Sequence, residues 1–87
     1  MKDHIEISLE WEGRQADLAV PVAVTAPRLV ELLSQAFKAK NQKLPEQWHF
    51  SVKGKSVALE SGLTLKELGL GNGEIFQIVL GDWDEFI

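Results

Sequence analysis

The chain has 87 residues, no cysteine and a formal net charge of −4. Such a length suffices for one small domain, and the lack of cysteine excludes a disulfide framework and thiolate chemistry. The negative charge disfavours nucleic acid and anionic lipid as partners, because both bind clustered positive charge.

The N-terminal residues predict a β-hairpin. Residues 4–11 alternate strictly between apolar and polar side chains, as in a strand with one buried face. A turn containing Gly13 follows, and residues 16–22 alternate again. Pro21 lacks a backbone donor, so the second strand either lies at a sheet edge or ends there.

A helix is predicted from Thr25 to about Lys40. Thr25 can cap its N-terminus, and Pro27 suits the first turn, where a missing amide hydrogen costs nothing. The apolar positions follow helical spacing and predict one face packed on a sheet. They are Leu29, Leu32, Leu33, Ala36 and Phe37.

The C-terminal half predicts two further strands and a short one. In residues 48–53, Trp48, Phe50 and Val52 point inward and His49 points outward. A short apolar strand at 57–59 and a helical turn within 61–73 precede a last strand at 75–80. Phe76, Ile78 and Leu80 form the inward face of that strand. The sequence thus indicates an α+β fold, with a mixed sheet on one main helix.

No motif in the chain predicts catalysis, a cofactor or a metal. The string GKS at 54–56 lacks the upstream glycine and the long helix of a phosphate-binding loop. GLGNG at 69–73 precedes a strand instead of following one, so it predicts a tight turn in which Asn72 and Gly73 tolerate positive φ. His4 and His49 fall on the polar face without a third ligand, and we expect both to be solvated.

We expect a cytoplasmic protein that does not insert into a membrane. The first residues lack the apolar segment of a signal peptide. No stretch approaches the roughly 18 uninterrupted apolar residues that can cross a bilayer.

Two segments resemble ubiquitin and its β-grasp relatives, namely residues 17–33 and residues 48–79. In particular they resemble the small YukD/EsaB-type ubiquitin-like proteins of type VII secretion loci. Trp48 opens the third strand as in that family. The residues of the C-terminal part that carry the resemblance are Leu65, Leu68, Gly69, Asn72, Gly73, Glu74, Phe76 and Ile78.

The resemblance implies a β-grasp roll of order ββαββ, with a short helical turn before the last strand. It implies a non-catalytic, accessory or regulatory protein whose partners are proteins, including membrane components of a type VII secretion machine. The family carries no catalytic residues. Ser51 and Gln77 occupy outer positions where ubiquitin has parts of its apolar binding patch, so recognition by ordinary ubiquitin-binding modules is not implied.

Two alternatives remain open, a covalent modifier or sulfur carrier and an adaptor unrelated to secretion. Covalent chemistry is disfavoured, because it needs a terminal Gly-Gly pair and the sequence ends in Phe86 and Ile87, unless processing exposes a glycine.

The last residues are predicted to form a tail distinct from the domain. We expect the ubiquitin-like domain at 1–80 and an acidic, aromatic tail at 81–87. Trp83, Phe86 and Ile87 are candidate partner-binding residues, because aromatic side chains dominate binding at small interfaces. The tail either folds back loosely on its own domain or docks on the secretion machinery or on a second copy, which would make a homodimer.

Overall fold

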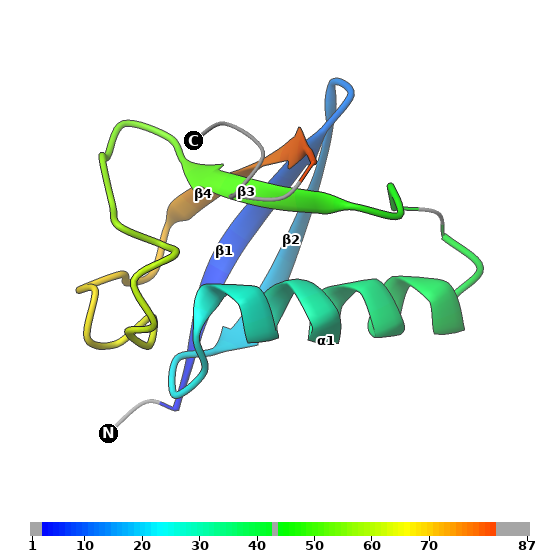
Figure 1. Ribbon diagram of the computed structural model, residues 1–87. Coiled ribbons are helices and arrows are strands. Elements are labelled where there is room, and N and C mark those ends of the chain that lie inside the picture. Colours follow the sequence, from blue (N-terminus) through cyan, green and yellow to red (C-terminus); the bar gives the residue numbers. More distant parts are fainter. Residues whose placement is uncertain (1–2, 43, 82–87) are drawn as a thin grey trace.

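The computed structural model describes residues 3–42 and 44–81, in which a helix crosses one face of a four-stranded sheet (Figure 1). The elements are β1 (His4–Trp11), β2 (Arg14–Pro21), α1 (Ala26–Ala39), β3 (Trp48–Val52) and β4 (Glu74–Leu80). The strands lie in the order β2-β1-β4-β3, with β1 and β4 parallel and the other pairs antiparallel. This arrangement confirms the predicted α+β, β-grasp fold of order ββαββ.

The turn of the β1–β2 hairpin contains only two residues. Trp11 pairs with Arg14, and Glu12 and Gly13 between them have φ of +50° and +75°. Positive φ at both central positions is typical of the type I′ turn, whose twist matches that of the flanking strands. β2 therefore begins earlier than predicted. It ends at Pro21 on the sheet edge, as predicted.

The start of α1 follows the sequence prediction. Thr25 Oγ1 accepts a hydrogen bond from the Arg28 amide at 3.3 Å. Pro27 lies in the first turn, where its missing donor leaves no bond unmade.

The buried face of α1 differs from the predicted stripe. The buried helical residues are Ala26, Leu29 and Leu33. Val30 and Phe37 pack against the core from the margins. Leu32 is only half-buried and Ala36 is exposed, contrary to prediction. Successive helical residues are rotated by about 100°, so a face centred on Leu33 turns Leu32 away from the sheet.

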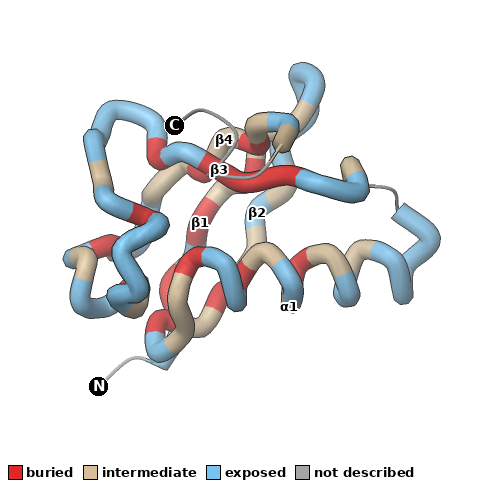
Figure 2. The backbone as a smooth tube through the Cα atoms, viewed as in Figure 1, coloured by how far each residue is buried: buried red, intermediate tan, exposed pale blue. Residues whose placement is uncertain are grey.

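The core lies between α1 and the sheet, where the buried residues of β1, β3 and β4 gather (Figure 2). The rings of Phe50 on β3 and Phe76 on β4 stack with their centroids 4.5 Å apart. Trp48 is 2% exposed, and its indole nitrogen donates to Ser34 Oγ on α1 at 2.9 Å. Its hydrogen-bonding group is thus satisfied inside the protein, and β3 is tied to the helix.

The prediction of a short strand at residues 57–59 is wrong. The chain after β3 turns at Gly54 and continues without a strand until β4. The amide of Leu59 bonds locally to the carbonyl of Val57 at 2.9 Å. Leu59 is buried in the core and holds the loop there by packing. This packing explains the apolar sequence pattern, although the loop forms no strand hydrogen bonds.

The predicted turn before β4 is present and is closed by a capping box. The Leu68 amide bonds to the Thr64 carbonyl at 3.0 Å. The Thr64 amide donates to Glu67 Oε1 at 2.9 Å, and the Glu67 amide donates to Thr64 Oγ1 at 3.1 Å. The hydrogen bonds from the Thr64 backbone and hydroxyl hold the pKa of the Glu67 carboxyl below its usual value of 4.5.

One residue of β4 departs from the predicted inward face. Phe76 and Ile78 are buried as predicted, but Leu80 is 58% exposed. It is the last residue of the strand, where the side chain lies at the end of the sheet.

Replacing Leu29 by alanine should lower the free energy of unfolding by about 2 to 5 kcal/mol, because the side chain is buried and its loss leaves a cavity. The matched change Leu32→Ala should cost about 1 kcal/mol or less, since Leu32 does not pack on the core. Chemical denaturation of both variants measures the difference. Equal losses would show that the helix face has been placed wrongly.

As the pH is lowered into the acidic range, the native chain should lose more stability than a Glu67→Gln variant. A carboxyl whose pKa is lowered by folding stabilises the protein above its unfolded pKa. That contribution disappears as the pH falls from 4.5 through the lower folded value. Urea denaturation of the two chains at neutral pH and at several acidic values measures the effect. A stability difference between the two chains that is the same at every pH would exclude this contribution of Glu67.

Candidate interaction surfaces

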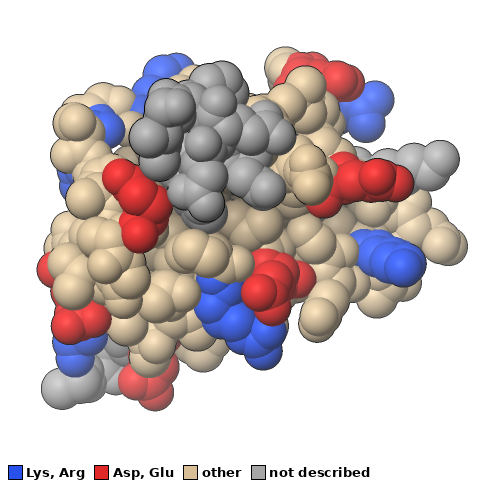
Figure 3. All heavy atoms as spheres, in the orientation of Figure 1, with Lys and Arg blue, Asp and Glu red and all other residues tan. Residues whose placement is uncertain are grey.

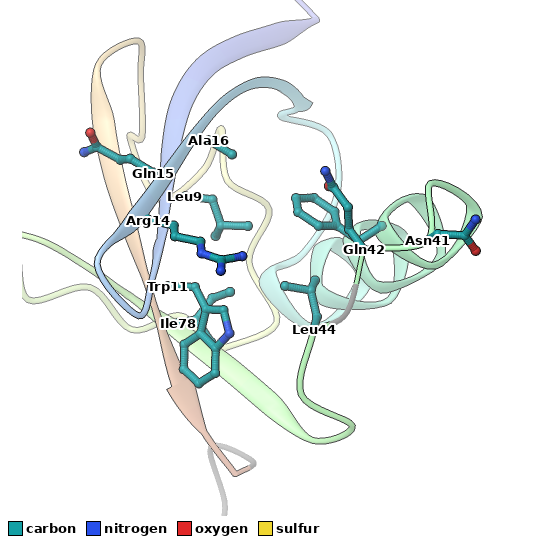
Figure 4. Close-up of a pocket in the computed structure, with 10 residues that line it drawn as sticks. Leu9, Trp11, Arg14, Gln15, Ala16, Asn41, Gln42, Leu44 and Ile78 are labelled. Atoms are coloured by element: carbon teal, nitrogen blue, oxygen red, sulfur yellow. The ribbon is translucent and has the colours of Figure 1, made fainter.

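A groove of about 420 Å³, lined by both apolar and polar side chains, opens at the end of the roll where α1 stops (Figure 4). Strands β1, β2 and β4, the end of α1 and the loop that follows all contribute to it. The lining residues are Leu9, Trp11, Arg14, Gln15, Ala16, Phe37, Asn41, Gln42, Leu44 and Ile78. Trp11 is the last residue of β1, and its side chain is only half-buried.

The groove combines an apolar floor with one cationic side chain. Leu9 and Ile78 form an apolar floor, and both are buried. Arg14 is the one charged residue among the described residues that line it, and its side chain extends from β2 toward Leu44 (Figure 4). Within residues 3–42 and 44–81 this guanidinium makes no ion pair. The groove can therefore accept an apolar side chain with an acidic group beside it.

A second hollow of about 430 Å³ adjoins the groove and shares Trp11, Arg14 and Leu44 with it. It extends to Pro45 and to the exposed Leu80. Glu12 also lines this hollow, so the combined surface from the end of α1 to the end of β4 carries one acidic and one basic side chain among apolar ones.

The face of the sheet opposite α1 is largely polar. Glu10 accepts hydrogen bonds from Gln15 and Gln77, both at 3.2 Å, and lies 4.0 Å from the Lys53 ammonium. Ser51 lies directly opposite Gln77 in the β3–β4 ladder. This placement agrees with the outward orientation predicted for both residues, and the centre of the face presents amide and hydroxyl groups.

The prediction that His49 is solvated is wrong, whereas His4 is exposed as predicted. His49 is 8% exposed, and its Nδ1 lies 2.6 Å from the carbonyl oxygen of Gly81. The chain turns at Gly81, which has φ of +92°, a conformation that glycine adopts without strain. This hydrogen-bond partner lies 32 residues away in the sequence, and strand alternation does not reveal it.

The glycine-rich string at 69–73 has a structural role, as predicted, but Asn72 does not have positive φ. Its side-chain oxygen accepts a hydrogen bond from the Glu6 amide at 2.9 Å, and the Gly73 amide donates to the Glu6 carbonyl at 2.8 Å. The string therefore joins the start of β4 to β1.

Metal-binding groups do not converge in the described part of the chain. No three His, Cys, Asp or Glu side chains of residues 3–42 and 44–81 could together hold a metal ion. The same residues contain no helix long and apolar enough to cross a membrane. On the face shown in Figure 3, basic side chains lie singly among acidic ones and form no continuous positive patch.

The candidate partner-binding residues Trp83, Phe86 and Ile87 lie outside the described residues. The sequence prediction missed the groove, because its lining comes from segments that are far apart in the chain. Trp11 was one available signal, since a large aromatic at the end of an amphipathic strand tends to lie at the margin of the core.

Comparison with known proteins gives two matches. The family model described as WXG100 protein secretion system (Wss), protein YukD, matches residues 4–78. An uncharacterized protein of Clostridium acetobutylicum is 33% identical over 79 residues, which cover 91% of this chain and 86% of that protein. The span matched by the family contains β1, β2, α1, β3 and most of β4, together with all the residues that line the groove.

Proposed function

The chain belongs to the YukD family of the WXG100 protein secretion system, and we propose that it serves this system as a non-catalytic ubiquitin-like domain that binds other proteins. The groove is the observation that supports a binding role. Its lining combines apolar and amide side chains with one cation that makes no ion pair within residues 3–42 and 44–81. The lining includes no Ser, His, Cys, Asp or Glu that could act as nucleophile or base.

The groove is the proposed binding surface for a partner. Trp11, Phe37 and Arg14 line it, and aromatic residues and arginine are the types that carry most binding energy at protein interfaces. The partner segment would place an apolar side chain over Leu9 and a carboxylate near Arg14. The centre of the outer sheet face, around Ser51, offers polar groups instead.

The partners we propose are protein components of the secretion machine, including its membrane subunits on the cytoplasmic side. The domain would reach the membrane through them. A second copy of the chain is a further possible occupant of the groove. An adaptor unrelated to secretion remains the alternative, and it predicts that secretion components are not recovered with the protein.

A side chain that fills the groove should reduce capture of the partner. Ala16 lines the groove from β2 and is only half-buried, so Ala16→Arg should block the floor while the fold is kept. Capture of secretion components from the native host should fall at least roughly tenfold, which corresponds to about 1.4 kcal/mol of binding free energy.

The matched control is Ser51→Arg, which adds the same side chain to the exposed outer face. Thermal melting of both variants shows whether the fold is kept, and a sizing column shows whether the native chain forms a dimer through the groove. Equal capture by Ala16→Arg and the native chain would contradict the proposal that the groove binds the partner. Loss with Ser51→Arg alone would place binding on the outer face.

The protein should not become covalently attached to others. Conjugation and sulfur transfer require a Gly-Gly pair, and the sequence contains no such pair at any position. Mass spectrometry of the tagged chain from the native host should therefore find only the unmodified mass. An isopeptide or a thiocarboxylate at a processed glycine would establish the modifier or carrier alternative instead.

A further inference from the structure

β2 is an edge strand of the sheet and, among the described strands, pairs only with β1. Its hydrogen-bonding pattern follows from Glu6 on β1, whose amide and carbonyl bond to the loop before β4. Glu6 and its partner Ala19 are therefore a non-hydrogen-bonded pair, and such pairs alternate along an antiparallel ladder. By this alternation the amides and carbonyls of Gln15, Asp17 and Ala19 point outward from the edge.

These outward groups form a short free ladder. No backbone group of residues 3–42 and 44–81 bonds to the outward amides and carbonyls of Gln15, Asp17 and Ala19. Pro21, the last residue of β2, has no amide hydrogen and ends the free stretch. A row of unpaired amides and carbonyls is a template for one more strand, and extended peptides bind other domains in this way. The edge is thus chemically matched to an extended peptide.

The side of β2 that faces α1 can receive apolar side chains from an added strand. Ala16 is paired with Leu9, the floor of the groove, and its methyl group leaves space beside that floor at the edge. Leu18 lies on the same side and is half-buried at the margin of the core. Opposite residues of neighbouring strands share a face. Apolar side chains opposite these two residues would therefore cover Leu18 and enter the groove from the edge.

β2 carries one charge on each face, and neither makes an ion pair within residues 3–42 and 44–81. Arg14 lies on the groove side. Asp17 lies on the outer side, where Ser8 donates a hydrogen bond to its carboxylate at 2.6 Å. Opposite charges that face each other across two strands stabilise the pair. An added strand with an acidic residue opposite Arg14 and a basic residue opposite Asp17 satisfies both charges.

A second copy of the chain does not meet these requirements through its own β2. Residues opposite each other in a ladder share a face, so Arg14 of one copy cannot lie opposite Asp17 of the other in any register. Each copy also carries a net charge of −4, which opposes association of two copies. The edge therefore favours a different protein as its partner.

We propose that a partner protein adds an antiparallel fifth strand to β2, an inference that rests on the proposed binding role of the groove. From its N-terminus, the added strand has a polar residue opposite Ala19, then an apolar, a basic, an apolar, a polar and an acidic residue, the last opposite Arg14. Its first apolar side chain lies over Leu18 and its basic side chain faces Asp17. Its second apolar side chain enters the groove beside Ala16.

A synthetic peptide tests this pairing on the full-length chain. The peptide Ser-Val-Lys-Val-Thr-Glu, capped at both ends, has the required pattern, and a nitrogen-15 chain is titrated with it to millimolar concentration. Amide signals of Gln15, Asp17 and Ala19 should shift and exchange more slowly with solvent, whereas those of Ser51 on the opposite edge strand should not change. Unshifted signals along β2, or shifts confined to another surface, would overturn the proposal.

An exchange of charges tests the register. Asp17→Lys should weaken binding of this peptide about threefold or more, the loss expected from reversing one cross-strand charge pair. A second peptide with Glu in place of its Lys should bind Asp17→Lys more tightly than it binds the native chain. A merely structural role of Asp17 would not produce this reversal of preference. If both proteins prefer the same peptide, the basic residue does not lie opposite Asp17 and the assigned pairing is refuted.

A proline on the edge tests the backbone contacts. Ala19→Pro removes one outward amide and leaves the hydrogen bonds between β1 and β2 in place. It should weaken peptide binding about three- to tenfold, as expected for one lost hydrogen bond, whereas the control Ala19→Thr keeps the amide and should bind normally. Thermal melting shows that both variants are folded. If Ala16→Arg loses capture of secretion components and Ala19→Pro keeps it, the added strand is refuted while the groove remains the binding surface.

Discussion

The parallel pairing of β1 with β4 is the constraint on which the rest of the structure depends. It places residues from the two ends of the described chain side by side in the middle of the sheet, with Leu9 opposite Phe76. Glu6 fixes this register through its amide and carbonyl, which bond to Asn72 and Gly73. A parallel pair needs a long connection, and here that connection contains α1, β3 and the loop that seals one end of the core. The hairpin partner β2 and the edge strand β3 then lie on opposite sides of this central pair.

The same arrangement explains why the two ends of the roll differ. At one end the loop between β3 and β4 covers the core with Leu59, Leu65 and Leu70, all of them buried. At the other end the hairpin ends of β1 and β2, the end of α1 and the connection from α1 to β3 line the groove (Figure 4).

Local sequence patterns predicted the strands and the helix because each has a period, a cap or a turn within its own residues. Thr25 and Gly13 mark boundaries in this way. The same patterns cannot fix which helical residue lies at the centre of the buried face, so Leu32 was predicted to point inward. They also cannot show where the end of a strand becomes exposed, as at Leu80. The apolar run at 57–59 mimics a strand because a loop can also bury one leucine. The groove and the burial of His49 depend on contacts between distant segments, which no local period encodes.

The central position of the last strand also governs how the protein acquires its structure. During synthesis the β1–β2 hairpin and α1 are made first, and the hydrogen-bonding edge of β1 stays without its partner until β4 appears. An unpaired strand edge with an apolar face readily pairs with another chain. Contacts between residues so far apart in sequence also slow folding. The nascent chain is therefore most prone to aggregation just before its final strand is available, and the glutamates and the histidine on the outer face of β1 act as charged and polar gatekeepers during that interval.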